Sequence, residues 1–131
     1  MTAEPPAPGP PLFIYGSLRD PAVRARLLGD RPDLTTCPAV LHGHARQTVP
    51  GFGYPFVVPA APDAQVDGDL LLGIHDADYA ILDAYEDIDD GLYVRVAATV
   101  ETSNGPVDAR VYLRGPAAPP AGSPDRPGTE L

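Results

Sequence analysis

The chain of 131 residues carries 18 acidic side chains against nine arginines and no lysine, so its formal net charge is −9. This charge argues against a nucleic-acid partner, which would need a basic surface. The lack of lysine excludes Schiff-base chemistry and the lysine of phosphate-binding loops. A single cysteine, Cys37, excludes an internal disulfide framework, and we expect it to be a packed thiol rather than a nucleophile.

The length suits one domain, and proline and glycine concentrate at its two ends. Residues 1–10 and 115–131 lack apolar periodicity, so we expect disordered, proline-rich tails around a domain at residues 11–114. No segment resembles a signal peptide or reaches the roughly 20 apolar residues of a membrane span. We therefore expect a cytoplasmic protein with no membrane partner, and the sequence leaves the oligomeric state open.

The first apolar run, residues 12–15, predicts a buried strand that stops at Gly16 and Ser17. Asp20 followed by Pro21 is typical of an N-cap and the first residue of a helix, and Gly29 is a suitable end for it. A strand, a Gly-Ser turn and a helix in this order often form an anion-binding pocket. The segment alone is equally compatible with a simple tight connection.

The middle of the chain predicts three further strands. Residues 37–49 alternate loosely and are expected to form one strand, which a turn at 51–55 follows. Residues 56–59 predict a short strand and residues 66–74 another. The two glycines of 66–74 indicate a bulge or a close backbone crossing.

Residues 76–88 switch to the helical period, with Asp76 as the expected cap. Their predicted buried stripe is Ile81, Leu82, Tyr85 and Ile88. Residues 92–101 and 107–114 alternate cleanly around a turn and predict a hairpin. About six strands and two helices in mixed order favour an α+β domain, in which the helices flank a small mixed β-barrel.

One carboxylate of the second helix stands apart by its geometry. At about 100° per residue, Asp83 and Asp87 are expected to project away from the apolar stripe. Glu86 lies on the edge of the stripe, one turn beyond Leu82 and two turns beyond Tyr79. Partial desolvation there would raise the pKa of Glu86 towards the range of a general acid or base. A glutamate on the helix surface is the alternative that periodicity leaves open.

Several short motifs follow one another in a specific order. They are Tyr15-Gly16-Ser17-Leu18, Tyr54-Pro55, Gly68, Leu82-Asp83-Ala84-Tyr85-Glu86 and Leu92-Tyr93-Val94-Arg95. Together, over roughly residues 12–113, they resemble the γ-glutamylcyclotransferase-like family, which includes the AIG2-like proteins. Asp87 departs from the resemblance because many members carry glycine there, which puts the subfamily and the substrate in doubt.

The resemblance implies a small β-barrel enzyme that acts on a small-molecule γ-glutamyl substrate. It would release 5-oxoproline and an amine, as an acyltransferase or lyase, without a cofactor or a metal. A binding loop would hold the α-carboxylate of the glutamyl group, and its residues would be Tyr15, Gly16, Ser17 and Leu18. Glu86 would be the catalytic acid and base, and Tyr93 would have a supporting role in substrate binding.

Three other hypotheses are compatible with parts of the sequence. Ser17 as a nucleophile is disfavoured because the Gly-x-Ser-x-Gly motif is absent. His42 and His44 would share one strand face, and His75 or an aspartate could complete a metal site, although ordinary polar strand residues explain this spacing better. The third hypothesis is a noncatalytic module that binds a carboxylate-bearing metabolite in the same pocket.

Overall fold

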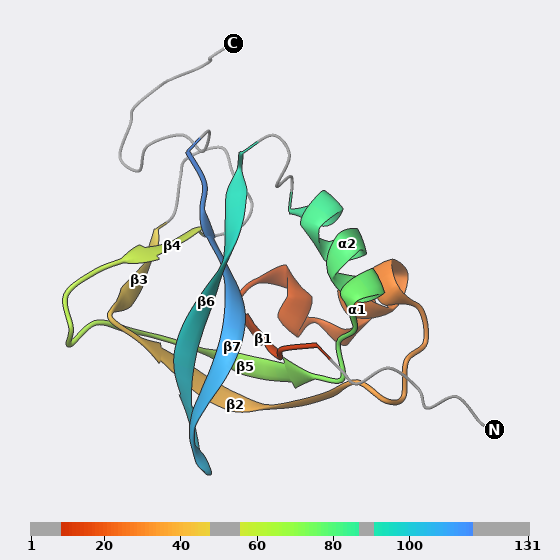
Figure 1. Cartoon of the computed structure of the whole chain (residues 1–131), viewed down its shortest axis with the longest axis horizontal. Helices are drawn as coiled ribbons and strands as arrows, with labels where there is room; N and C mark the ends of the chain where they lie inside the picture. The colour runs from red at the N-terminus through yellow and green to blue at the C-terminus, as the bar shows by residue number, and fades with distance from the viewer. Residues whose placement is uncertain (1–8, 48–55, 87–90, 117–131) are drawn as a thin grey trace.

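The computed structural model describes residues 9–47, 56–86 and 91–116. Five strands form a closed barrel (Figure 1). In barrel order they are β1 (Leu12–Ile14), β5 (Gln65–Leu72), β2 (Thr35–His42), β6 (Tyr93–Thr102) and β7 (Gly105–Arg114). A separate two-stranded sheet contains β3 (His44–Gln47) and β4 (Phe56–Pro59). The helices are α1 (Pro21–Leu28) and α2 (Asp76–Tyr85), and a 3-10 turn, η1 (Ser17–Arg19), precedes α1.

The short strand β1 closes the barrel. It pairs with β5 in antiparallel orientation and with β7 in parallel orientation. Figure 1 shows α1 and α2 together at one side of the barrel, with the β3–β4 sheet at the other. The predicted α+β class and mixed barrel with two flanking helices are confirmed. The described residues contain seven strands rather than six.

Strand β1 is buried on both faces, which explains its continuous apolar sequence. Leu12 and Ile14 contribute to a core cluster that also contains residues of η1 and α2. Phe13 contributes to a second cluster, formed mainly by residues of the other barrel strands. All three β1 side chains are at most 2% exposed. The chain that leaves β1 is therefore fixed in position by two cores.

Helix α1 begins and ends where the sequence predicts. The Asp20 side chain accepts a hydrogen bond from the Ala22 N–H at 2.9 Å, and Pro21 occupies the first helical position. The N–H of Gly29 closes the helix on the carbonyl of Ala25. The cap fixes the direction of the chain directly after η1, so it also limits how η1 can move.

The prediction of one strand over residues 37–49 is wrong. Strand β2 ends at His42, and Gly43 has a φ of +73°, a backbone conformation that glycine adopts without a steric penalty. Strand β3 then pairs with β4 instead of continuing the barrel. The turn expected at residues 51–55 lies outside the described residues.

Gly68 lies where β5 crosses β1 at close range, as the sequence indicated. A Cβ atom there would overlap the carbonyl oxygen of Ile14 and lie 2.8 Å from the ring of Phe13. Because glycine has no side chain, the two backbones approach closely at this point. This crossing lies directly before the Tyr15–Leu18 segment.

The orientation of α2 differs from the predicted one. Its N-cap is His75 rather than Asp76. Its buried residues are Asp78, Tyr79 and Leu82, whereas Ile81 and Tyr85 of the predicted stripe are 43% and 39% exposed. Ile88 and Asp87 lie outside the described residues.

The predicted hairpin at the C-terminal end of the domain is confirmed as β6 and β7, which pair along their full length. Three residues that we assigned to the tails contact the domain. The N–H of Gly9 donates to the carbonyl of Ile74 at 2.6 Å, Pro10 accepts a hydrogen bond from Tyr79 at 2.6 Å, and the Gly115 N–H donates to Leu92 at 2.8 Å. None of the helices in the described ranges is long and apolar enough to span a membrane.

Candidate functional site

The Tyr15–Leu18 segment forms a tight turn between β1 and α1. The N–H of Arg19 donates to the carbonyl of Gly16 at 3.0 Å, which closes η1. Leu18 is 5% exposed and belongs to the core cluster beneath α2. The turn therefore has one residue anchored in the core, and its backbone follows directly from the fixed end of β1. The side chain of Ser17 lies outside the described part of the structure.

Tyr15 is a buried residue whose phenol is hydrogen-bonded to a barrel strand. Its ring is 8% exposed, and its hydroxyl donates a hydrogen bond to the backbone carbonyl of Tyr112 on β7. Burial raises the pKa of the Tyr15 phenol well above its ordinary value, and the negative charge of Glu86 raises it further. The positive charge of Arg46 acts in the opposite direction. Tyr15 therefore remains a neutral hydrogen-bond donor around neutral pH.

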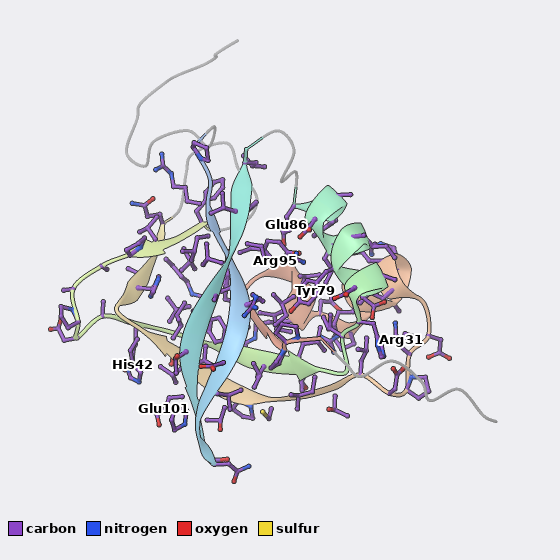
Figure 2. The ribbon with its side chains drawn as sticks, viewed as in Figure 1. Arg31, His42, Tyr79, Glu86, Arg95 and Glu101 are labelled. Carbon is purple, nitrogen blue, oxygen red and sulfur yellow. The ribbon has the colours of Figure 1, made fainter. Side chains whose placement is uncertain are left out.

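Glu86 lies at the C-cap of α2, where its N–H donates to the carbonyl of Leu82 at 2.9 Å. The residue is neither fully buried nor fully exposed. Figure 2 shows it at the end of the helix, on the side that faces the barrel strands. Its charge acts on the phenols of both Tyr15 and Tyr112. The structure thus brings Glu86 close to the Tyr15–Leu18 turn, although the two are far apart in the sequence.

Asp83 also faces the barrel. We expected it to project away from the apolar stripe, but Ile81 and Tyr85 of that stripe are the partly exposed side of α2, and the side that carries Asp83 faces inwards. Its Oδ1 accepts a hydrogen bond from the Tyr112 hydroxyl at 2.7 Å and lies 3.4 Å from Nη1 of Arg95. Burial, followed by the Asp83 contact, raises the pKa of the Tyr112 phenol well above its ordinary value. Sequence periodicity missed Asp83 because its partners come from β6 and β7, which lie elsewhere in the chain.

Arg95 contacts both Asp83 and Tyr79 of α2. Its guanidinium lies 4.3 Å from the centroid of the Tyr79 ring, within the range of a cation–π contact. Burial raises the pKa of the Tyr79 phenol to about 12, and this phenol donates to the Pro10 carbonyl. Figure 2 shows Arg95 and Tyr79 close together between β6 and α2. Alternation along β6 gave no signal that Arg95 faces α2.

Tyr93 is a core residue in this structure. It is 3% exposed, and its ring stacks on that of Phe56 with centroids 4.8 Å apart. It shares the core cluster with Leu18, Leu82 and Tyr112. Its place is therefore beneath the candidate site, against residues of both the turn and α2.

An ion pair anchors the beginning of α2 and so helps to orient the end that carries Glu86. Arg31 donates to Oδ1 of Asp78 at 2.7 Å and also binds Asp33. Oδ2 of Asp78 accepts the N–H of His75 at 2.9 Å. Burial alone would raise the pKa of Asp78, but the hydrogen bonds from Arg31 and from the His75 backbone outweigh it, and the net pKa is lowered.

The histidines do not form the ligand set considered from the sequence. His42 ends β2 and His44 begins β3, so they do not lie on one strand, and His75 caps α2. Within the described ranges, no three His, Cys, Asp or Glu residues are grouped so that they could hold a metal ion. Cys37 is half-buried against the second core cluster, as expected for a packed thiol.

Comparisons with known sequences find relatives of this chain among AIG2 and AIG2-like proteins. The chain is 38% identical to Protein AIG2 C of Arabidopsis thaliana over 89 residues, which are 68% of this chain and 50% of that protein. It is 36% identical to AIG2-like protein C of the same plant over 102 residues, 77% of this chain and 58% of that protein. The chain therefore spans only about half the length of these curated relatives.

Solved structures show the same fold. A solution structure of an Arabidopsis thaliana protein matches with a TM-score of 0.70 at 27% identity, over 89% of this chain and 77% of that one. A structure named gamma-glutamyl cyclotransferase matches with a TM-score of 0.66 at 21% identity, over 79% of this chain and 65% of that one. The family model described as gamma-glutamyl cyclotransferase, AIG2-like, matches residues 12–129. The chain belongs to the AIG2-like gamma-glutamyl cyclotransferase family.

Proposed function

We propose that this protein releases 5-oxoproline from a γ-glutamyl compound, with the Tyr15–Leu18 turn as binding loop and Glu86 as general acid and base. The observation that carries the proposal is that the turn and the end of α2 meet at Tyr112, which accepts a hydrogen bond from Tyr15 and donates one to Asp83. The charge of Glu86, which follows α2, also acts on the phenol of Tyr15 at the start of the turn. Membership of the AIG2-like family supports the reaction class.

The reaction is intramolecular and needs few protein groups. The α-amine of the glutamyl group attacks the side-chain amide carbonyl and forms a new C–N bond, which closes a five-membered ring. The bond from that carbonyl to the departing nitrogen then breaks. One carboxylate can take the proton from the attacking ammonium and return it to the leaving nitrogen. The remaining task is to hold the reactive conformation.

The loop supplies the proposed binding contacts. Backbone N–H groups of a tight turn can converge on an anion, and such charge-assisted hydrogen bonds are stronger than neutral ones. The substrate α-carboxylate would accept N–H groups of Gly16, Ser17 and Leu18. Tyr93, in the core beneath the turn and α2, would support this arrangement from below rather than touch the reacting atoms.

The neighbourhood of Glu86 suits proton transfer. It lies among phenols whose raised pKa values keep them protonated, and the nearby charge of Asp83 is paired with Arg95. Because Glu86 is only partly exposed, a bound substrate would remove it further from water. Desolvation of this kind favours the neutral acid and raises the pKa of a carboxyl group.

The test is a screen of γ-glutamyl amino acids, γ-glutamylamines and glutathione for 5-oxoproline release. We expect at least one compound to be turned over by the wild-type protein and not by a Glu86→Gln variant prepared in the same way. Binding of γ-glutamyl compounds without release from any of them would contradict the proposal and support the noncatalytic binding module. A fully active Glu86→Gln variant would overturn the role of Glu86.

A further inference from the structure

Two arginines bind the two ends of the proposed binding loop. Nη1 of Arg46, on β3, donates to the carbonyl oxygen of Tyr15 at 2.7 Å. Nη1 of Arg24, on α1, donates to the carbonyl oxygen of Leu18 at 2.7 Å. In each case the acceptor is a backbone carbonyl, so the contact fixes the path of the chain and not the position of another side chain.

Arg46 joins the chain just beyond β1 to strand β5. Its Nη2 donates to the carbonyl of Asp67 on β5 at 2.8 Å, while the β1–β5 ladder ends at the pair Ile14 and Asp69. One planar guanidinium therefore joins the chain beyond β1 to β5, just past the last paired residues. The Cζ atom of Arg46 also lies 5.9 Å from the centroid of the Tyr15 ring. The two parallel donors of this fork have no equivalent in lysine or glutamine.

Arg24 reaches back from the first turns of α1. Its own N–H donates to the carbonyl of Asp20, the N-cap. Because the cap fixes the start of α1 relative to η1, the Arg24 side chain meets the Leu18 carbonyl at the end of the loop. With the Arg19 to Gly16 bond inside the turn, donors hold the carbonyls of Tyr15, Gly16 and Leu18.

Holding a carbonyl fixes the N–H that follows it. The peptide bonds in the described ranges are all trans, and in a planar trans peptide the N–H points opposite to the C=O. The contact of Arg46 with Tyr15 therefore sets the direction of the Gly16 N–H. The bond to the Gly16 carbonyl sets the direction of the Ser17 N–H in the same way.

We propose that Arg46 and Arg24 are positioning residues for the N–H groups with which the Tyr15–Leu18 loop would bind a ligand carboxylate. Arg46 acts through the Tyr15 carbonyl on the Gly16 N–H, whereas Arg24 acts through the Leu18 carbonyl on the Arg19 N–H, which closes the turn on Gly16. Their guanidinium charges also favour an anion at this point of a chain whose net charge is −9. This inference rests on the proposed function, since it assigns the loop the role of carboxylate holder. The proposal also implies that the β3–β4 sheet contributes to the site, because Arg46 lies on β3.

The kinetic test compares Arg46→Gln, Arg46→Lys and Arg24→Gln with the wild type on the best substrate of the γ-glutamyl screen. We expect KM to rise about tenfold or more in Arg46→Gln and less in Arg24→Gln, while kcat changes less than threefold. Arg46→Lys retains the charge without the fork, so its KM should lie between those of the wild type and Arg46→Gln. The matched control is Arg26→Gln, which removes an exposed charge from α1 and should leave KM unchanged.

A second measurement does not depend on turnover. We expect the amide hydrogen of Arg19, which closes the turn on the Gly16 carbonyl, to exchange at least tenfold faster in Arg46→Gln than in wild type, with amides of β6 and β7 unaffected. Titration with L-glutamate as the carboxylate probe should shift the NMR signals of the Gly16 and Ser17 amides in wild type. The Arg46→Gln protein should need a higher glutamate concentration for the same shift.

The outcomes separate the two proposals. If no γ-glutamyl compound is turned over but glutamate shifts the loop amides and Arg46→Gln weakens the effect, the proposed reaction fails and the positioning role stands. If exchange at Arg19 is the same in all variants, or KM is unchanged in a folded Arg46→Gln protein, the positioning role is overturned. A kcat loss equal to the KM effect in Arg46→Lys would also overturn it.

Discussion

Different kinds of interaction stabilise the two sides of the candidate site. On the loop side, residues 15–18, arginines bind backbone carbonyls. On the helix side, the end of α2, the acid Asp83 binds a phenol and an arginine. The loop side thus presents N–H groups in a cationic setting, and the helix side gathers carboxylates and neutral phenols. The net charge of the whole chain describes neither side.

Tyr112 belongs to both sides. Its backbone carbonyl accepts the Tyr15 hydroxyl, and its own hydroxyl donates to Asp83. The proposed division between binding on the loop side and proton transfer on the helix side therefore depends on one strand, β7, which contacts both sides. Variants that affect one side only should separate the two tasks.

The largest expected effect comes from the helix side. Glu86→Gln keeps the size of the side chain but removes the proton acceptor, so we expect kcat for 5-oxoproline release to fall about 100-fold to 10,000-fold. KM should change little, because the loop side is intact. Initial rates over a range of substrate concentrations give both constants. Glu101→Gln, at an exposed position of β6, is the control and should behave as wild type.

Gly68→Ala should disturb the loop side at the end of β1, directly before the loop begins. The new methyl group would overlap the Ile14 carbonyl and press on Phe13, so the free energy of unfolding should fall by about 3 kcal/mol. Urea denaturation measures this change. Gly43→Ala is the comparison, because its methyl group would meet no atom within 4 Å and only the positive φ of +73° opposes it, at about 1 kcal/mol. Equal losses in both variants would argue against a close crossing at Gly68.

Asp78→Asn should loosen the beginning of α2. The variant loses the charge that Arg31 binds, and we expect a loss of about 2 kcal/mol in the free energy of unfolding at neutral pH. Because the folded protein lowers the pKa of Asp78, this stabilisation is present above the pKa of the unfolded chain and is lost as the pH falls through the folded value. The difference between wild type and variant should therefore shrink below about pH 4.

Asp76→Asn serves as the control for the loss at neutral pH, since Asp76 is an exposed acid in the first turn of the same helix. Its free energy of unfolding should lie much closer to that of wild type than the free energy of unfolding of Asp78→Asn does. A gap between wild type and Asp78→Asn that stays constant from pH 7 to pH 3 would show that the ion pair is not its source.

The smallest expected effect is at the link between the two sides. Tyr112→Phe removes the hydrogen bond to Asp83 and keeps the backbone carbonyl that Tyr15 uses, so the free energy of unfolding should fall by about 1 kcal/mol. A double-mutant cycle with Asp83→Asn isolates the contact. Fully additive losses would mean that the hydroxyl and the carboxylate do not interact in solution.

Local sequence signals predicted the elements with local causes. The cap at Asp20, the crossing at Gly68 and the alternation of the last hairpin are all fixed by neighbouring residues, and each is confirmed. Periodicity placed Glu86 only on the edge of the apolar stripe and left a position on the helix surface open, so its role stays a prediction. The order of the elements already favoured the barrel and the family resemblance implied it as well, although no single segment encodes its closure.

The orientation of α2 was not predictable in this way. Apolar periodicity turned Ile81 and Tyr85 inwards, whereas the structure buries Asp78 and leaves those two partly exposed. Asp78 and Asp83 face inwards because Arg31, Tyr112 and Arg95 satisfy them. These partners lie in other elements, so the energetic reason for the orientation does not exist within the helix sequence.

The closure of the barrel by β1 also sets an order of events for the nascent chain. β1 forms its parallel pairs with β7, near the end of the domain, and the Tyr15 to Tyr112 hydrogen bond spans 97 residues of sequence. Contacts of such separation form late because a long loop must close first. A ribosome-bound chain that stops before β7 would contain every residue of the Tyr15–Leu18 loop together with Asp83 and Glu86, but it would lack the strand that connects the two sides.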